Sequence, residues 1–142
     1  MADINQLQTL ISLLNRPEGR KIWTEFRSQH EWIDISAADL TARAIRDFDL
    51  SRVNFSKAIF SGADLTGADL SGADIRNADL RGASLQYANL TGAVVRNADV
   101  ARADLTGVVL DKDAATEFRN FDRAVFRQSR YRAMRDRHKV YS

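Results

Sequence analysis

The side chains of this 142-residue sequence that could do chemistry are mainly carboxylates and guanidinium groups, because it has no Cys and only two His. Carboxylates gathered in a cleft can bind a metal or transfer protons, and histidine is the usual proton carrier near neutral pH. However, His30 and His138 lie near opposite ends of the sequence, and no zinc-protease, serine-hydrolase, phosphate-loop or dinucleotide motif occurs. The sequence therefore predicts no enzyme, no catalytic residue, no metal and no cofactor, and His30 is expected to be a packing or interface residue.

The carboxylates recur at a fixed spacing that explains them without catalysis. Asp64, Asp69 and Asp74 lie five residues apart, and each precedes a large aliphatic residue. A helix repeats about every 3.6 residues and a strand every 2, so a period of five fits neither. From Ile35 to Leu110 every fifth residue, sixteen in succession, is a large aliphatic residue or Phe. The regular carboxylates are therefore expected to be solvated members of a structural repeat.

Each repeat unit has two inward residues and three outward ones. The residue two before the central one is apolar, usually Ala, in fifteen of the sixteen units, and Arg43 is the exception. The outward places hold mostly Asp, Asn, Ser, Thr, Arg or Gly, which suit turns or solvent. Residues twenty apart remain apolar in all four central columns, as in Ile35, Phe55, Ile75 and Val95. We expect the Arg43 side chain to reach solvent, because burying an unpaired charge is costly.

This tandem A(D/N)LxG pattern, clear in residues 63–67 and 68–72, resembles the pentapeptide-repeat family over residues 33–112. The resemblance implies an all-β solenoid, a right-handed quadrilateral β-helix in which four units make one square coil, so about four coils are expected. Coils spaced by about 4.8 Å would form a stub roughly 20 Å tall. Solenoid repeats contact only their neighbours, so the two ends need caps.

Residues 1–32 lack the repeat and are expected to form an N-terminal helical cap. Asp3 with Gln6 resembles a capping box for a first helix ending near Asn15, and Pro17 suits the first turn of a second helix. We expect the apolar faces of both helices to cover the first coil, whereas a partner-binding amphipathic helix is the alternative. These faces comprise Ile4, Leu7, Leu10, Ile11 and Leu14, then Ile22, Trp23, Phe26 and His30.

Residues 113–142 are basic, with eight Lys or Arg against four Asp or Glu, and three structures are open for them. The first is a cap helix with a solvated basic extension, and the second is an arm that binds an anionic or grooved partner. The third is a further partial coil after an out-of-register insertion, because Phe121, Phe126 and Tyr131 fall five apart. The helix would begin at Asp113 and dock through Ala114, Phe118, Phe121 and Val125.

The leading functional hypothesis is a scaffold or adaptor that presents a rigid β-helix wall and the basic arm to a protein partner. Basic and aromatic residues are the candidate contacts, because they give electrostatic steering and reach. In the arm they are Arg127, Arg130, Tyr131, Arg132, Met134, Arg135, Arg137, Lys139 and Tyr141, and in the repeats Arg76, Arg81, Arg96, Arg102 and Tyr87. The apolar residues Ile59, Val94 and Val109 also occupy outward places.

The resemblance implies a second function, because several members of the family act as duplex-DNA mimics that occupy the DNA site of gyrase. Such mimicry needs a dense negative field. Residues 33–112 instead carry eleven acidic and nine basic residues, so this rod is nearly neutral. A third hypothesis is that the arm binds nucleic acid or an anionic surface.

Composition gives the remaining expectations. The chain has a formal net charge of +2, no apolar run long enough to span a membrane and no basic-then-apolar leader. We expect one domain with appendages, and the lack of Cys is compatible with a reducing cytoplasm. The sequence leaves the oligomeric state open.

Overall fold

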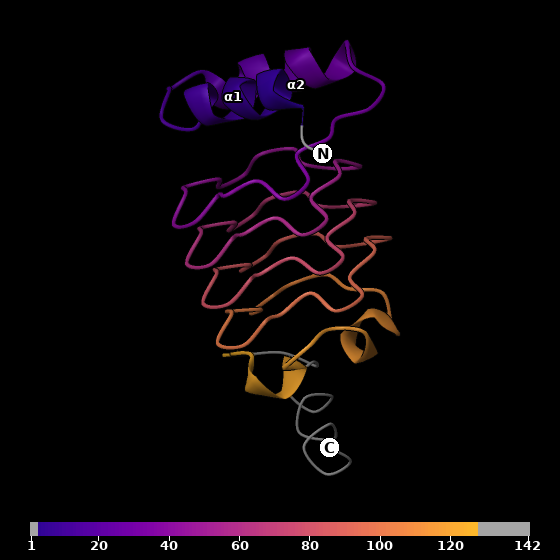
Figure 1. Ribbon diagram of the computed structural model, residues 1–142. Coiled ribbons are helices and arrows are strands. Elements are labelled where there is room, and N and C mark those ends of the chain that lie inside the picture. Colours follow the sequence, from indigo (N-terminus) through magenta and orange to yellow (C-terminus); the bar gives the residue numbers. More distant parts are fainter. Residues whose placement is uncertain (1–2, 128–142) are drawn as a thin grey trace.

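The computed structural model of this chain describes residues 3–127. Figure 1 shows a rod of stacked coils with two α-helices lying across its N-terminal end. The helices are α1 (Ile4–Leu13) and α2 (Gly19–Ser28), and two short 3₁₀ helices, η1 (Ala114–Thr116) and η2 (Phe121–Arg123), lie at the other end. Neither α-helix of the described part is long and apolar enough to cross a membrane.

The coils are joined by parallel bridges between residues that lie twenty apart, or twenty-one apart for Asp104 and Val125, and these bridges form four ladders. Within residues 3–127 each bridge is isolated, so the walls contain no longer strand. We name the four walls in chain order faces A to D, so that B lies opposite D. The ladders are 34–54–74–94 on face A, 39–59–79–99–119 on face B, 44–64–84–104–125 on face C and 49–69–89–109 on face D.

Each unit spans five residues because a tight turn follows every central residue. The carbonyl oxygen of Leu65 accepts a hydrogen bond from the Ala68 N–H at 3.0 Å, which closes the turn, and Gly67 between them has φ +70°. Corner residues from Ala37 to Gly107 all have φ between 55° and 70°. Glycine and asparagine tolerate this left-handed conformation best, so the turn explains their recurrence every five residues.

The repeated Asp and Asn side chains are part of the same turn. An Oδ1 atom in each accepts a hydrogen bond at 2.9–3.1 Å from the backbone N–H two residues later, so the side chain holds the first corner residue. Within residues 3–127 the acceptors are Asp34, Asp39, Asp49, Asn54, Asp64, Asp69, Asp74, Asp79, Asn89, Asp99 and Asp104.

Replacing Asp69 by alanine is expected to destabilise the chain by about 1 kcal/mol, because the Ser71 N–H loses its acceptor at 2.9 Å. Asp69→Asn keeps an oxygen in the same place and is expected to change the free energy of unfolding by less than half as much. Urea denaturation of both variants measures the difference. Equal losses would show that the charge, and not the hydrogen bond, explains Asp at this position.

The core is a column of mainly aliphatic side chains, with an aromatic pair in the second coil. The central residues from Ile35 to Leu105 are all at most 1% exposed, and the rings of Phe55 and Phe60 meet edge to face at 5.2 Å in the second coil. Arg43 is exposed, which agrees with the expectation that its charge stays in water.

The two helices share this core, since Leu10, Leu13 and Trp23 belong to the same buried cluster as the first coil. The indole Nε1 of Trp23 donates to the Asp49 carbonyl oxygen at 2.8 Å. Three details differ from the sequence predictions: Ile4 is 67% exposed, α1 ends at Leu13, and α2 begins at Gly19 instead of near Pro17.

The capping box is only half formed. The Asp3 side chain accepts from the N–H groups of Asn5 and Gln6, as an N-cap does. Gln6 does not reach back to Asp3, because its Nε2 donates to the Trp32 carbonyl at 3.0 Å and its Oε1 accepts from the Asp34 N–H at 2.8 Å. The amide of Gln6 therefore fastens α1 to the entrance of the first coil.

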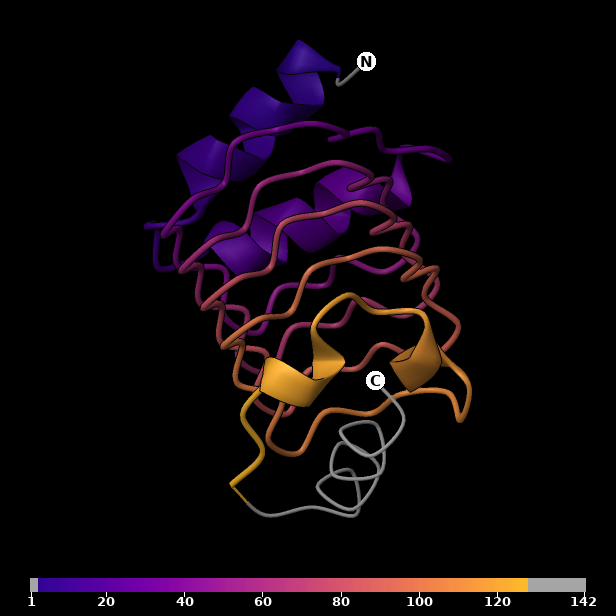
Figure 2. The ribbon, with the colours of Figure 1, turned by 60° about the horizontal axis from the view of Figure 1, so that its bottom comes forward.

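The α-helix predicted to begin at Asp113 is wrong for the described residues. Arg119 and Val125 instead bridge to the fourth coil on faces B and C, with η1 and η2 between them, so residues 113–127 form a partial fifth coil (Figure 2). The bridge partners lie 20 residues apart on face B and 21 residues apart on face C. The extra residue before Val125 is the out-of-register insertion of the third alternative. Phe118, Phe121 and Phe126 point into the core, whereas Val125 is 39% exposed.

Candidate functional site

Face B carries basic residues along both of its corners. Backbone hydrogen bonds stack Lys57 on Arg76, and Asn77 on Arg96, along the corner with face A. Along the corner with face C, Gly82 binds Ala101 and Arg102 binds Arg123. Arg119 lies on face B itself, where it bridges to Asp99 of the fourth coil. We call this surface the basic wall; its cations are Lys57, Arg76, Arg81, Arg96, Arg102, Arg119 and Arg123.

Two of these arginines are neutralised by a carboxylate of their own unit. Arg76 and Arg81 each hold the aspartate two residues earlier through two nitrogens, with the closest contacts at 2.6 Å to Asp74 and 2.7 Å to Asp79. Hydrogen bonds from these guanidinium groups hold the pKa values of both carboxyls below their usual range. Arg76 and Arg81 thus contribute little net charge to the basic wall.

The other five cations of the basic wall form no ion pair within the described residues. The side chains of Lys57, Arg96, Arg102, Arg119 and Arg123 are all exposed. Exposed guanidinium groups without a partner can bind carboxylates or phosphates through paired hydrogen bonds. The basic wall can therefore attract an anionic partner.

A hollow of about 320 Å³ lies at the C-terminal end of the basic wall, where the fourth coil meets the fifth. Arg102 and Arg123 line it, and a backbone hydrogen bond of 3.1 Å from the Arg102 N–H to the Arg123 carbonyl places them side by side. Asp99 also lines the hollow, but its Oδ1 already accepts from Ala101 N–H and from the Asn120 amide at 2.9 Å. The remaining lining residues are Arg81, Ala101 and Asn120.

The acidic residues of faces C and D are largely paired. Asp47 contacts Arg20, Asp49 contacts Arg27, Asp64 contacts Arg46 and Asp104 contacts Arg127, at nitrogen–oxygen distances between 2.5 and 3.8 Å. Four of the carboxylates on these two faces thus have a cation beside them, which weakens any negative field that they could project.

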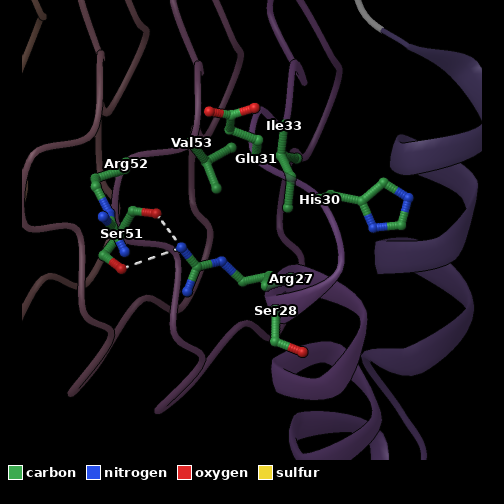
Figure 3. Close-up of a pocket in the computed structure, with 8 residues that line it drawn as sticks. All are labelled: Arg27, Ser28, His30, Glu31, Ile33, Ser51, Arg52 and Val53. Atoms are coloured by element: carbon green, nitrogen blue, oxygen red, sulfur yellow. Dashed lines mark hydrogen bonds between the residues drawn. The ribbon is translucent and has the colours of Figure 1, made fainter.

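A second hollow, of about 280 Å³, lies between the end of α2 and the first coils (Figure 3). Arg27 extends from α2 across it, and its Nη2 donates to the carbonyl and hydroxyl oxygens of Ser51. Burial opposes ionisation of Asp49, but hydrogen bonds from Ser51 and Arg27 outweigh it and hold the pKa of Asp49 below its usual range. These contacts of Arg27 therefore fasten α2 to the rod. His30 has a packing role, because its ring stacks on that of Phe26 with the ring centres 3.9 Å apart.

Exposed apolar side chains are distributed over several faces. Tyr87 is 65% exposed and its ring lies over Gly107, where an added Cβ would come within 2.4 Å of Tyr87 Cδ1. Val94 and Val109 are each 44% exposed, on faces A and D, and Ile59 is 37% exposed on face B. These residues do not form one patch. Within residues 3–127, no three His, Cys, Asp or Glu side chains are grouped to hold a metal ion.

The structure brings four of the predicted contact residues, Arg76, Arg81, Arg96 and Arg102, onto the basic wall, and it separates Tyr87 from them at the corner of faces C and D. The predictions for the arm after Arg127 concern residues outside the described part of the chain. Sequence reasoning missed Arg119 and Arg123 as contact residues. The five-residue spacing of Phe121 and Phe126 was the signal that could have placed these two arginines in a fifth coil.

Comparison with known proteins agrees with this architecture. The family model described as pentapeptide repeats matches residues 33–72 and 73–111. The chain is similar to the solved structure of a pentapeptide repeat protein (Rfr23) from the cyanobacterium Cyanothece 51142. The identity is 32% and the TM-score 0.56, over 68% of this chain and 61% of that one. A search of curated proteins finds no match.

Two further solved structures have lower scores. HetL is a pentapeptide repeat protein involved in heterocyst differentiation regulation from the cyanobacterium Nostoc sp. strain PCC 7120. It shares 29% identity at a TM-score of 0.44, over 55% of this chain and 47% of that one. QnrB1, a plasmid-mediated fluoroquinolone resistance protein, shares 14% identity at a TM-score of 0.37, over 72% and 65%. The chain thus spans less than two thirds of the length of each of these three proteins. The repeat, its four bridge ladders and the family match together show that this chain belongs to the pentapeptide-repeat family.

Proposed function

We propose that this chain is a non-enzymatic scaffold whose basic wall binds a protein partner within a larger assembly. The observation that carries the proposal is the set of five cations that make no ion pair within residues 3–127 and that lie on face B and its two corners, on a rod built from continuous ladders. A rigid surface loses little conformational freedom on binding, and like charges fixed on one face give a partner a preferred orientation. The basic residues from Arg127 to Tyr141 would add further cations for the same partner.

The lining of the hollow on the basic wall supports a binding role over catalysis. Four of its six lining residues are charged, whereas substrate pockets are mostly apolar. The family's DNA-mimic activity against gyrase is the alternative, but the pairing of Asp47, Asp49, Asp64 and Asp104 with arginines gives it no support from this surface.

Affinity capture from the native cell lysate tests the proposal, with Arg96→Glu/Arg119→Glu as the wall variant. A protein retained by the full chain is expected to be reduced about tenfold by the wall variant, because reversing two interface charges adds repulsion. Arg52→Glu is the control, since Arg52 is exposed at the corner of faces D and A and makes no ion pair within the described residues. Equal retention by all three proteins would contradict the proposed surface. Retention of gyrase or topoisomerase subunits by all of them would favour the DNA-mimic function.

A further inference from the structure

The hollow between Arg102 and Arg123 differs from the rest of the basic wall because it is lined by two arginines that make no ion pair within residues 3–127. Their backbones are hydrogen-bonded across neighbouring coils, which lie about 4.8 Å apart in a parallel ladder. At that separation two arginine side chains can reach the same carboxylate or two successive ones. The hollow of about 320 Å³ gives such a group room beside them.

The lining residues leave the two guanidinium groups available. Arg81 is engaged by Asp79, and the Oδ1 atom of Asp99 is held by the Ala101 N–H and the Asn120 amide. Neither Arg102 nor Arg123 makes a salt bridge within residues 3–127. An arginine pair in this state binds carboxylates and phosphates through paired hydrogen bonds.

The acidic residues within the basic wall favour a protein over a nucleic acid as the partner. Asp99, Glu117 and Asp122 lie among the arginines of the fourth and fifth coils. A phosphate backbone has a charge at every step and would be repelled by these carboxylates, because nucleic-acid affinity depends on many cations acting together. A protein segment can place its acidic side chains opposite the arginines only.

We propose that this hollow is the binding site for an acidic segment of the partner protein, whose Asp or Glu carboxylates are bound by Arg102 and Arg123. This inference rests on the proposed function and adds the chemistry of the partner to it. The segment lies against the junction of the fourth and fifth coils, so it contacts one arginine of the repeat, Arg102, and one that lies beyond it, Arg123. Binding by this surface is expected to weaken with salt, because both arginines are exposed.

The test uses the full chain and a fluorescein-labelled oligoglutamate peptide of about ten residues as the probe, followed by fluorescence anisotropy at low and physiological salt. Arg102→Glu/Arg123→Glu is expected to weaken peptide binding about tenfold or more. Arg52→Glu is a matched control, because Arg52 and Arg102 both occupy left-handed corners, with φ 58° and 60°. Arg135→Gln/Arg137→Gln measures the contribution of the C-terminal residues.

Binding that is lost in the Arg102/Arg123 variant and kept in both other variants supports the inference. Three results would overturn it: no peptide binding by the full chain, equal weakening by Arg52→Glu, or loss only with Arg135→Gln/Arg137→Gln. Tighter binding of a single-stranded oligothymidylate of equal charge would also overturn it in favour of nucleic acid. If the charge-reversed variant unfolds by circular dichroism, Arg102→Gln/Arg123→Gln replaces it with the same expectation. A partner captured through Arg96 and Arg119 alongside a negative peptide result would leave the proposed function standing and remove only this inference.

Discussion

Replacing Trp23 by alanine is expected to lower the free energy of unfolding by about 3–5 kcal/mol, the usual cost of removing a fully buried aromatic side chain. Trp23 is 0% exposed, and its indole donates to the Asp49 carbonyl at 2.8 Å. The variant loses the contact between α2 and the first coil, so the apolar side chains at the end of that coil are expected to become accessible to solvent. Urea denaturation measures the loss of stability, and dye binding measures the exposed apolar surface.

Trp32 provides a matched control for this prediction, because it is the other tryptophan of the chain and is 60% exposed. Trp32→Ala is expected to change stability by about 0.5 kcal/mol or less, as is usual for an exposed side chain. Similar losses in the two variants would contradict the packing of α2 against the rod.

At the opposite end, Phe121→Ala is also expected to cost about 3–5 kcal/mol. Phe121 is 2% exposed, its ring meets that of Phe126 edge to face at 5.3 Å, and it stacks on Phe118 at 6.0 Å. Its removal opens the base of the fourth coil, where the partial fifth coil now covers the core. The measurement is again the midpoint and slope of urea denaturation.

Val125→Ala distinguishes the fifth coil from the helix that the sequence suggested. In that helix Val125 would lie on the docked stripe with Phe121, so both substitutions would be costly. In the structure Val125 is 39% exposed, and its loss is expected to cost under about 1 kcal/mol. A large effect of Val125→Ala would contradict the arrangement of residues 113–127.

The interior of the rod could be predicted from the sequence because every unit repeats the same constraints. A central aliphatic residue, a small residue two before it and a left-handed corner follow one another at fixed spacing, so Ile35, Phe55 and Ile75 fall in one column. The pairing of Arg76 with Asp74 was also within reach, since an aspartate that accepts from the backbone N–H two residues later lies close to that residue.

The ends could not be predicted in the same way, because tertiary contacts decide them. Gln6 satisfies the helix-start pattern, yet the first coil offers its amide a carbonyl and an N–H, and those bonds replace the local one. After Lys112 a helical stripe and a five-residue spacing both include Phe121, so the sequence alone does not choose between them. The open base of the fourth coil selects the second pattern, and the one-residue insertion before Val125 hides its register from the sequence. Without this register the sequence could not place Arg119 and Arg123 on the basic wall.

The central claim is that a protein partner binds face B, and photo-crosslinking tests it most directly. Ile59 and Val109 suit the experiment, because both are exposed bridge residues and they lie on opposite faces, B and D. A benzophenone amino acid would be placed at one position or the other in the full chain, followed by irradiation in the native lysate. We expect the protein retained by the full chain to crosslink from position 59 and not from position 109. Crosslinking from position 109 alone, or equally from both, would contradict the claim that the basic wall is the binding surface.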